Sequence, residues 1–70
     1  MKIQLNGENF QFERDKSLME LVKSLEKEWE ITLENAIVLV NDDIVPKGKW
    51  VETIIFEDNQ VEVLSFVSGG

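Results

Sequence analysis

The sequence predicts an α+β fold in which one main helix lies across one face of a mixed sheet of about five strands. Three observations support this class. Alternating runs flank Asn6-Gly7, apolar residues recur at helical spacing between residues 18 and 29, and strand-like runs occupy much of the chain after residue 36. With 70 residues, the chain has room for one domain with one modest core.

The first two strands are predicted on either side of a tight turn. Asn-Gly between two alternating runs is a strong hairpin signal, because both residues accept positive φ angles. We therefore expect strands near residues 1–6 and 9–13. The apolar members of the two alternating runs are Ile3, Leu5, Phe10 and Phe12.

A helix of about three turns is predicted from residue 18. Ser17 and Glu20 have the spacing of a capping box, in which the serine hydroxyl accepts a backbone N–H and the glutamate reaches back. We interpret the charged run Glu26-Lys27-Glu28 as a solvated face rather than a binding patch, because its signs are mixed. The apolar residues that share one helix face are Leu18, Leu21, Val22, Leu25 and Trp29.

The middle of the chain predicts one buried strand and one edge strand. The apolar run at residues 36–40 is short and rich in β-branched residues, which favours a strand buried on both faces. Residues 44–46 end in proline, which cannot donate a ladder hydrogen bond, so this segment is expected at a sheet edge. Residues 47–50 are predicted to form a turn that brings Trp50 back over the core.

The last strand is predicted at residues 60–67, after a turn at residues 57–59. If the helix covers one face of this strand, Leu64 and Phe66 lie on the other face, and such an uncovered apolar pair is a candidate docking surface. The alternative is that a loop, such as the one carrying Trp50, covers them. Successive residues point to opposite faces: Val61, Val63, Ser65 and Val67 share the covered face, and Gln60, Glu62, Leu64 and Phe66 share the other.

The order of these elements is strand, strand, helix, strand, strand, strand. The long connection through the helix allows later strands to pair in parallel with the first. This is the ubiquitin-like β-grasp arrangement. We expect residues 1–70 to form a single β-grasp domain, with residues 67–70 as a flexible C-terminal Gly-Gly tail.

The composition excludes most chemistry that side chains perform. The chain has no histidine and no cysteine, which removes imidazole acid-base catalysis, thiol nucleophiles, Cys/His zinc sites and disulfides. The acidic pairs Asp42-Asp43 and Glu57-Asp58 lack the ligand spacing of a calcium loop and are interpreted as turn residues. We predict no catalytic residue and no metal ligand, and we expect that the protein is not an enzyme.

Charge and hydropathy indicate which partners the protein avoids. Acidic residues outnumber basic ones 14 to 7, and the net charge of −7 disfavours binding to nucleic acid and to anionic membrane surfaces. We find no signal peptide, and the longest apolar run is too short to span a bilayer. These features predict a cytoplasmic protein whose partner presents a basic groove.

The C-terminal residues carry the one group for which we predict a reaction. Gly69 and Gly70 end the chain, and a segment without side chains can enter a channel too narrow for other residues. Attack of the terminal carboxylate on the α-phosphate of ATP would give an acyl adenylate, from which a sulfur nucleophile could displace AMP. The chain has no glycine-rich phosphate loop, so another protein would have to bind the ATP.

Residues 41–50, from Asn41 to Trp50, resemble the segment Asn-x-x-Ile-Val-Pro-Arg/Lys-x-x-Trp of the ThiS family, the sulfur carriers of thiamin thiazole synthesis. Val61-Glu62-Val63-Leu64 and the terminal Gly69-Gly70 are similar to that family's last strand and tail. Asn6-Gly7 and the helix start at Ser17 also fit, so the similarity spans the chain. One departure is Asp58-Asn59, where the family often has Gly-Asp.

This resemblance implies that Gly70 is adenylated by a ThiF-like enzyme that uses ATP and Mg²⁺. The carboxylate would then become a thiocarboxylate, with sulfur from a donor such as a cysteine desulfurase, and would pass its sulfur to the thiazole synthase ThiG. The carrier itself would bind no cofactor. Gly69 and Ser68 would form the tail that enters the partner active sites, and partner contacts are expected at Leu64, Phe66 and Val67.

Two alternatives remain open at this point. The first is a related β-grasp sulfur carrier for molybdopterin synthesis or tRNA thiolation, or a ubiquitin-like modifier, because these share the fold and the tail. The second is a non-covalent β-grasp interaction module whose terminal glycines are incidental. Deletion of Gly69 and Gly70 would abolish the function of a carrier and leave that of an interaction module intact.

Overall fold

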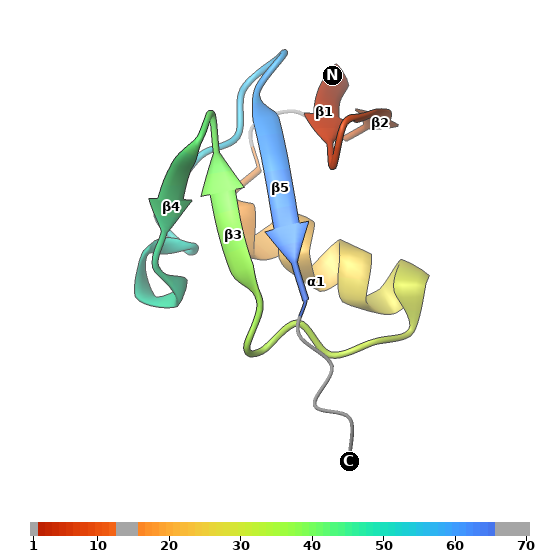
Figure 1. The fold of residues 1–70 in the computed structure, drawn as a ribbon, viewed down its shortest axis with the longest axis vertical. Coiled ribbons are helices and arrows are strands. Elements are labelled where there is room, and N and C mark those ends of the chain that lie inside the picture. Colours follow the sequence, from red (N-terminus) through yellow and green to blue (C-terminus); the bar gives the residue numbers. More distant parts are fainter. Residues whose placement is uncertain (1, 13–15, 66–70) are drawn as a thin grey trace.

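The computed structural model describes residues 2–12 and 16–65. Its five strands form one sheet in the order β2-β1-β5-β3-β4, and α1 lies across one face of that sheet (Figure 1). β1 pairs in parallel with β5, and the other neighbouring strands are antiparallel. The predicted mixed sheet, its helix and its β-grasp order are confirmed. The elements are β1 (Lys2–Leu5), β2 (Glu8–Gln11), α1 (Leu18–Trp29), β3 (Ile37–Val40), β4 (Asp43–Val45), the 3₁₀ helix η1 (Lys47–Lys49) and β5 (Gln60–Leu64).

The hydrophobic core lies between α1 and the face of the sheet that the helix covers, which we call the inner face. Burial of one large aliphatic side chain stabilises a fold by about 1.5–3 kcal/mol, so this layer contributes most of the hydrophobic stabilisation. The helix supplies Leu18, Leu21, Val22 and Leu25, the strands supply Ile3, Leu5, Val38, Val61 and Val63, and the connecting segments supply Phe12, Leu33, Trp50 and Ile55.

The start of α1 has the predicted capping box. The Ser17 hydroxyl accepts the N–H of Glu20 at 3.2 Å, and the Ser17 N–H donates to the Glu20 carboxylate at 3.2 Å. At the other end of the helix, Glu30 turns the chain in a left-handed conformation with φ of 56°. Trp29, which was predicted on the buried face, is 38% exposed, because it lies at the last helical position.

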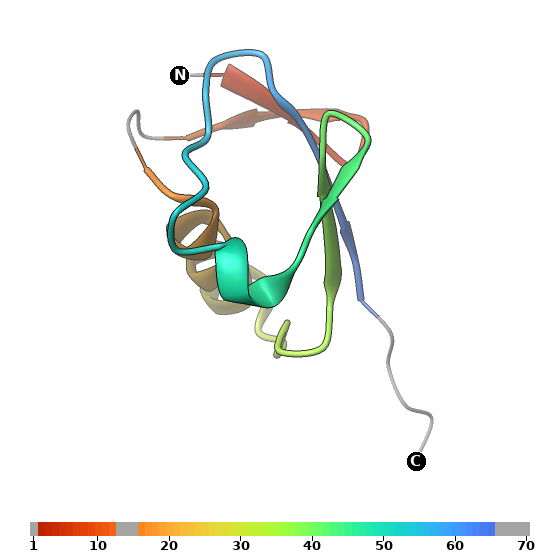
Figure 2. The same ribbon diagram turned by 90° about the vertical axis from the view of Figure 1, so that its left-hand side faces the viewer.

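Trp50 returns to the core, as predicted, but on the helix side of the sheet. Its exposed fraction is 2%, and its indole Nε1–H donates to the Val45 carbonyl at 2.8 Å. The Trp50 carbonyl also accepts the N–H of Met19 at 3.0 Å, which ties η1 to α1 (Figure 2). Because Trp50 packs against the inner layer, it does not cover Leu64, so that alternative is wrong for Leu64, and Phe66 lies outside the described residues.

The prediction that β3 is buried on both faces is wrong. Val38 is fully buried, whereas Ile37 is 39% exposed. One helix covers only one face of a sheet, and within the described residues no second layer packs on the other face (Figure 2). The apolar run of β3 therefore faces the core with Val38 and Val40, while on the other face Ile37 is exposed and Leu39 is half-buried.

Both hairpins close through left-handed turn residues. Asn6 and Gly7 have φ angles of 51° and 83°, and Asn41 and Asp42 have φ angles of 50° and 71°. Such two-residue turns match the twist of the strands that they join. In the turn before β5, Asp58 takes a φ of 65°, so the departure from the family's glycine keeps a left-handed turn there.

Candidate docking face and last strand

The face of the sheet opposite the helix, which we call the outer face, carries an apolar patch. The register of β3 and β5 places Ile37 beside Leu64, and the register of β3 and β4 places Leu39 beside Ile44. Residues directly opposite one another in a sheet share a face, so these four side chains form one surface. Leu64 is 46% exposed and Ile44 is 67% exposed. We call Ile37, Leu39, Ile44 and Leu64 the outer patch.

The remainder of the outer face is polar. Gln4 of β1 lies beside Gln60 of β5, and its side-chain Nε2–H donates to Oδ1 of Asn9 at 2.9 Å. Glu62 lies next to Leu39 in the register and is exposed. The apolar residues are thus confined to β3, β4 and the C-terminal end of β5. This arrangement suits a partner whose apolar surface has a basic rim.

The described residues include one of the residues at which partner contacts are predicted. Leu64 lies on the outer face and is exposed, as predicted. Ser65, which was predicted on the covered face, is exposed, because β5 ends at Leu64. The other predicted site residues lie outside the described part of the chain: Phe66, Val67, Ser68, Gly69 and Gly70.

Sequence reasoning missed the other members of the outer patch. The sequence pattern places Ile37 and Leu39 on a strand buried on both faces, and it places Ile44 only on an edge strand. A signal was present in the two-residue turn Asn41-Asp42, because a hairpin of that length pairs Val40 with Asp43 and therefore Leu39 with Ile44.

β5, the strand that leads to the C-terminal residues, is held near both ends by turn asparagines. At its start, the Asn41 N–H donates to the Gln60 carbonyl at 2.7 Å, and the Asn41 side-chain Oδ1 accepts the Gln60 N–H at 2.9 Å. Near its end, the side-chain Oδ1 of Asn6 accepts the Val63 N–H at 2.8 Å. Neither side-chain contact was predicted, because each joins residues that are distant in sequence.

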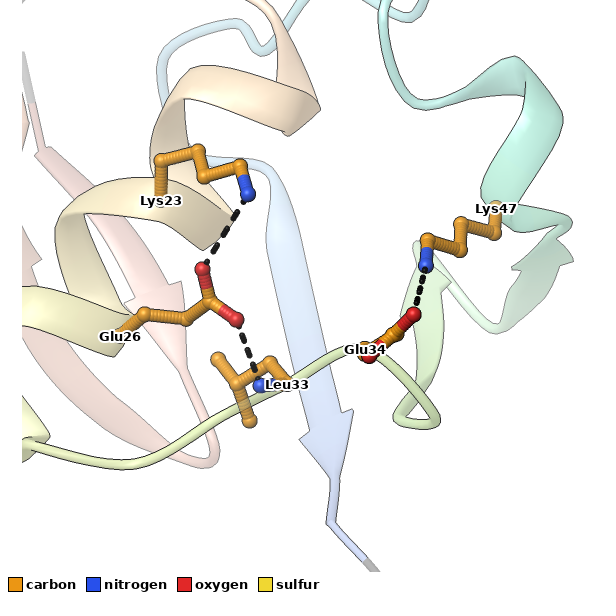
Figure 3. A network of polar contacts seen from close by, with 5 residues as sticks. All are labelled: Lys23, Glu26, Leu33, Glu34 and Lys47. Carbon is orange, nitrogen blue, oxygen red and sulfur yellow. Dashed lines mark hydrogen bonds and ion pairs between the residues drawn. The ribbon is translucent and has the colours of Figure 1, made fainter.

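A second polar cluster lies on the helix side of the sheet (Figure 3). One oxygen of the Glu26 carboxylate accepts the Leu33 N–H at 2.7 Å, and the other lies 3.5 Å from the Lys23 ammonium. The Leu33 N–H is the main cause of a lowered pKa for Glu26, and the nearby lysine charges lower it further, against a smaller opposing effect of desolvation.

Glu26 therefore does not belong to the solvated face, whereas Lys27 and Glu28 are exposed, as predicted. Its side chain is only 21% exposed, and it anchors the segment between α1 and β3. On the far side of this cluster, Lys47 of η1 lies 3.8 Å from Glu34 (Figure 3). The segment between α1 and β3 is thus bonded to α1 through Leu33 and to η1 through Glu34.

A cavity of about 300 Å³ lies beside the Glu26 and Glu34 contacts, and its lining includes Val22, Leu33 and Trp50. These three are core residues, and the charged side chains of the cavity include the pairs described above. Within residues 2–12 and 16–65, no group of three acidic side chains is placed to hold a metal ion. In the same residues, no helix has the length and apolar character needed to cross a membrane.

Comparison with known proteins adds a family and a fold. The ThiS family model matches residues 3–70. A crystal structure of a thiamine biosynthesis protein, ThiS, from Geobacter metallireducens matches with a TM-score of 0.82 and 22% sequence identity, over 100% of both chains. At this identity, the structural match supports the β-grasp fold. No protein among the curated ones matches the sequence.

Proposed function

Because this chain belongs to the ThiS family, we propose that it is a sulfur carrier protein of thiamin biosynthesis. In this proposal, the Gly70 carboxylate is adenylated and then converted to a thiocarboxylate that donates sulfur to the thiazole ring. The protein is a substrate of other enzymes and not an enzyme itself. ATP and Mg²⁺ are bound by a ThiF-like adenylating enzyme, and the sulfur acceptor is the thiazole synthase ThiG.

The observation that carries this proposal is the position of the outer patch at the end of β5. Leu64 is the last residue of β5 and a member of the patch, and six residues separate it from the end of the chain. Six residues reach at most about 20 Å when fully extended. A partner that binds the patch can therefore receive the terminal carboxylate in an active site within that distance.

The proposed chemistry needs only the carboxylate from this chain. A carboxylate oxygen attacks the α-phosphorus of ATP, and pyrophosphate leaves to give an acyl adenylate. A sulfur nucleophile, supplied through a donor such as a cysteine desulfurase, then attacks the acyl carbon, and AMP leaves. Gly69 and Ser68 form the narrow tail, and Leu64, Phe66 and Val67 contribute to the docking of partners.

The direct test is the intact mass of the protein after incubation with Mg-ATP, a ThiF-like enzyme and a sulfide donor. We expect a mass gain equal to the exchange of one oxygen for one sulfur, located at Gly70 and absent without ATP. An unchanged mass, with an enzyme that converts its own cognate carrier under the same conditions, would contradict the proposal and favour a non-covalent interaction module.

A substitution in the tail tests the narrow-channel part of the proposal. Gly69→Val is expected to leave the thermal unfolding midpoint unchanged, because position 69 lies five residues beyond the last strand. The same change should block adenylation, because a β-branched side chain is too wide for the channel. Pyrophosphate release measured with this variant gives the result, and a wild-type rate would disprove the steric argument.

A further inference from the structure

We propose that Asn6 is a positioning residue for the reaction at the C-terminus. Its side chain holds the end of β5 in the direction that delivers the following residues to the activating enzyme. This inference rests on the proposed carrier function. It assigns to a turn residue near the N-terminus a role in the chemistry of Gly70, which lies 64 residues further along the chain.

The role of Asn6 depends on the place where the pairing of β1 with β5 ends. β1 and β5 pair in parallel at Gln4 with Gln60 and at Leu5 with Val61. The Asn6 N–H adds one more ladder bond, to the Val61 carbonyl at 2.9 Å. At Asn6 the backbone then takes a φ of 51° and turns into the hairpin, whereas β5 continues to Leu64.

Beyond this point, the side chain of Asn6 bonds to β5 in place of the backbone of β1. Its Oδ1 accepts the Val63 N–H at 2.8 Å, and its Nδ2–H donates to the Val63 carbonyl at 3.4 Å. A carboxamide has the same donor and acceptor as a backbone peptide group. One side chain thus extends the parallel pairing of β5 by two hydrogen bonds, beyond the last backbone bond from β1.

Loss of this carboxamide would loosen the end of β5 without removing the strand from the sheet. The Val63 side chain is 5% exposed and stays anchored in the core, and Leu64 remains paired with Ile37 of β3. Three of the four residues of the outer patch belong to β3 and β4, and the bonds of Asn6 do not reach them. Docking through the patch should therefore persist while the direction of the strand end becomes less defined.

If the direction of the end of β5 is less defined, adenylation should be slower, because the terminal carboxylate must lie beside the α-phosphate of ATP. Once the carrier is docked, attack on ATP is effectively intramolecular, and its rate depends on the fraction of bound molecules in which the carboxylate is aligned. The expected result of losing the Asn6 side chain is a lower maximal rate of adenylation with little change in the affinity of the complex.

Asn41 provides a matched control within the same strand. It is also the first residue of a left-handed two-residue turn, and its side chain also accepts a backbone N–H of β5. It acts at Gln60, the first residue of the strand, so its loss should not alter how the strand ends. Asn6→Gly and Asn41→Gly both keep the left-handed turn, because glycine accepts positive φ angles, and each removes a carboxamide.

The experiment compares wild-type protein, Asn6→Gly and Asn41→Gly as full chains with a ThiF-like enzyme and Mg-ATP. We measure the dissociation constant of each complex and the maximal rate of pyrophosphate release at saturating carrier. We expect Asn6→Gly to lower the maximal rate by about tenfold or more, with a dissociation constant within about threefold of wild type, whereas Asn41→Gly stays within about twofold for both. Amide exchange at Val63 should accelerate in Asn6→Gly alone.

Equal maximal rates for the two glycine variants would overturn the inference and leave Asn6 as a structural turn residue. If the wild-type protein releases no pyrophosphate, the proposed carrier function falls, and this inference falls with it. Should Asn6→Gly fail to fold, Asn6→Asp replaces it, because it retains the acceptor for the Val63 N–H but sets an oxygen against the Val63 carbonyl. Its maximal rate should then be lower than wild type, and a wild-type rate would overturn the inference.

Discussion

In β3 and at the C-terminal end of β5, the inner and outer faces of the sheet carry the same kinds of side chain but differ in exposure. On the inner face, Val38, Val61 and Val63 are at most 5% exposed, whereas on the outer face Ile37 and Leu64 are 39% and 46% exposed. The two sets alternate along the same strands. Successive residues of a strand point to opposite faces, and a single helix covers only one of these faces. The difference in exposure follows from this arrangement and not from the hydrophobicity of the side chains.

Neighbouring residues of one strand therefore have different roles. Inner residues stabilise the fold, and outer residues are available to bind a partner. Inner residues are removed from water by the fold itself, so their burial stabilises the monomer. Outer residues remain in contact with water until a partner covers them, so their burial can stabilise only a complex. An exposed apolar patch on a chain with a net charge of −7 is therefore the expected site of partner binding.

The largest expected effect comes from placing a charge on each face of β5 in turn. Val63→Asp should lower the free energy of unfolding by more than about 4 kcal/mol, because it buries an unpaired carboxylate. Leu64→Asp, on the next residue, should change it by less than about 0.5 kcal/mol. Urea denaturation measures both, and losses of similar size would mean that the outer face is packed in the monomer.

The second effect concerns partner binding by the outer face. Leu64→Asp should weaken the complex with a ThiF-like enzyme by about tenfold or more, equivalent to about 1.4 kcal/mol. Val51→Asp is the matched control, because Val51 is as exposed as Ile44, at 67%, and lies in the segment after η1, outside the strands that carry the patch. Titration calorimetry compares the two, and equal dissociation constants would rule out the outer patch as the docking surface.

The third effect is on the helix that covers the inner face. Ser17→Ala removes the hydroxyl that accepts the Glu20 N–H and should reduce the free energy of unfolding by about 1 kcal/mol. The affinity for the partner enzyme should not change, because the cap lies on the opposite side of the sheet. A loss of affinity as large as the loss of stability would show that the two faces are not independent.

The smallest effect depends on pH. The pKa of Glu26 is lowered from 4.5 in the folded protein, so its charge stabilises the fold above that value, and this contribution is lost as the pH falls through the lowered pKa. Glu26→Gln keeps an acceptor for Leu33 but no charge. Its melting temperature should be below that of wild type at neutral pH, and the gap should close in acid. A gap independent of pH would contradict the assignment.

Local signals in the sequence predicted much of the fold. The Asn6-Gly7 turn, the capping box at Ser17 and the return of Trp50 to the core each depend on a few neighbouring residues or on one large side chain. The burial of β3 was mispredicted, because whether a face is covered depends on how many layers pack against the sheet. That number is a property of the tertiary structure and is not encoded in a five-residue run.

The candidate site was predicted less completely, for the same reason. The outward direction of Leu64 follows from the alternation of residues along one strand. Ile37 and Ile44 lie on the same surface only because of the register between β3, β4 and β5. The bond from Asn6 to Val63 connects residues 57 positions apart. Glu26 likewise differs from its exposed neighbours only because Leu33 folds back onto it.

The place of β5 in the sheet also bears on how the protein is made. β5 is the last strand in the chain but the middle one in the sheet, between β1 and β3. A ribosome releases the N-terminal hairpin and the helix first, and neither β1 nor β3 has its shared neighbour until residues 60–64 emerge. A nascent chain that stops earlier cannot close the sheet, and its exposed apolar residues make it a substrate for proteases. Because its middle strand comes last in the chain, this sheet can close only after nearly all of the sequence has been synthesised.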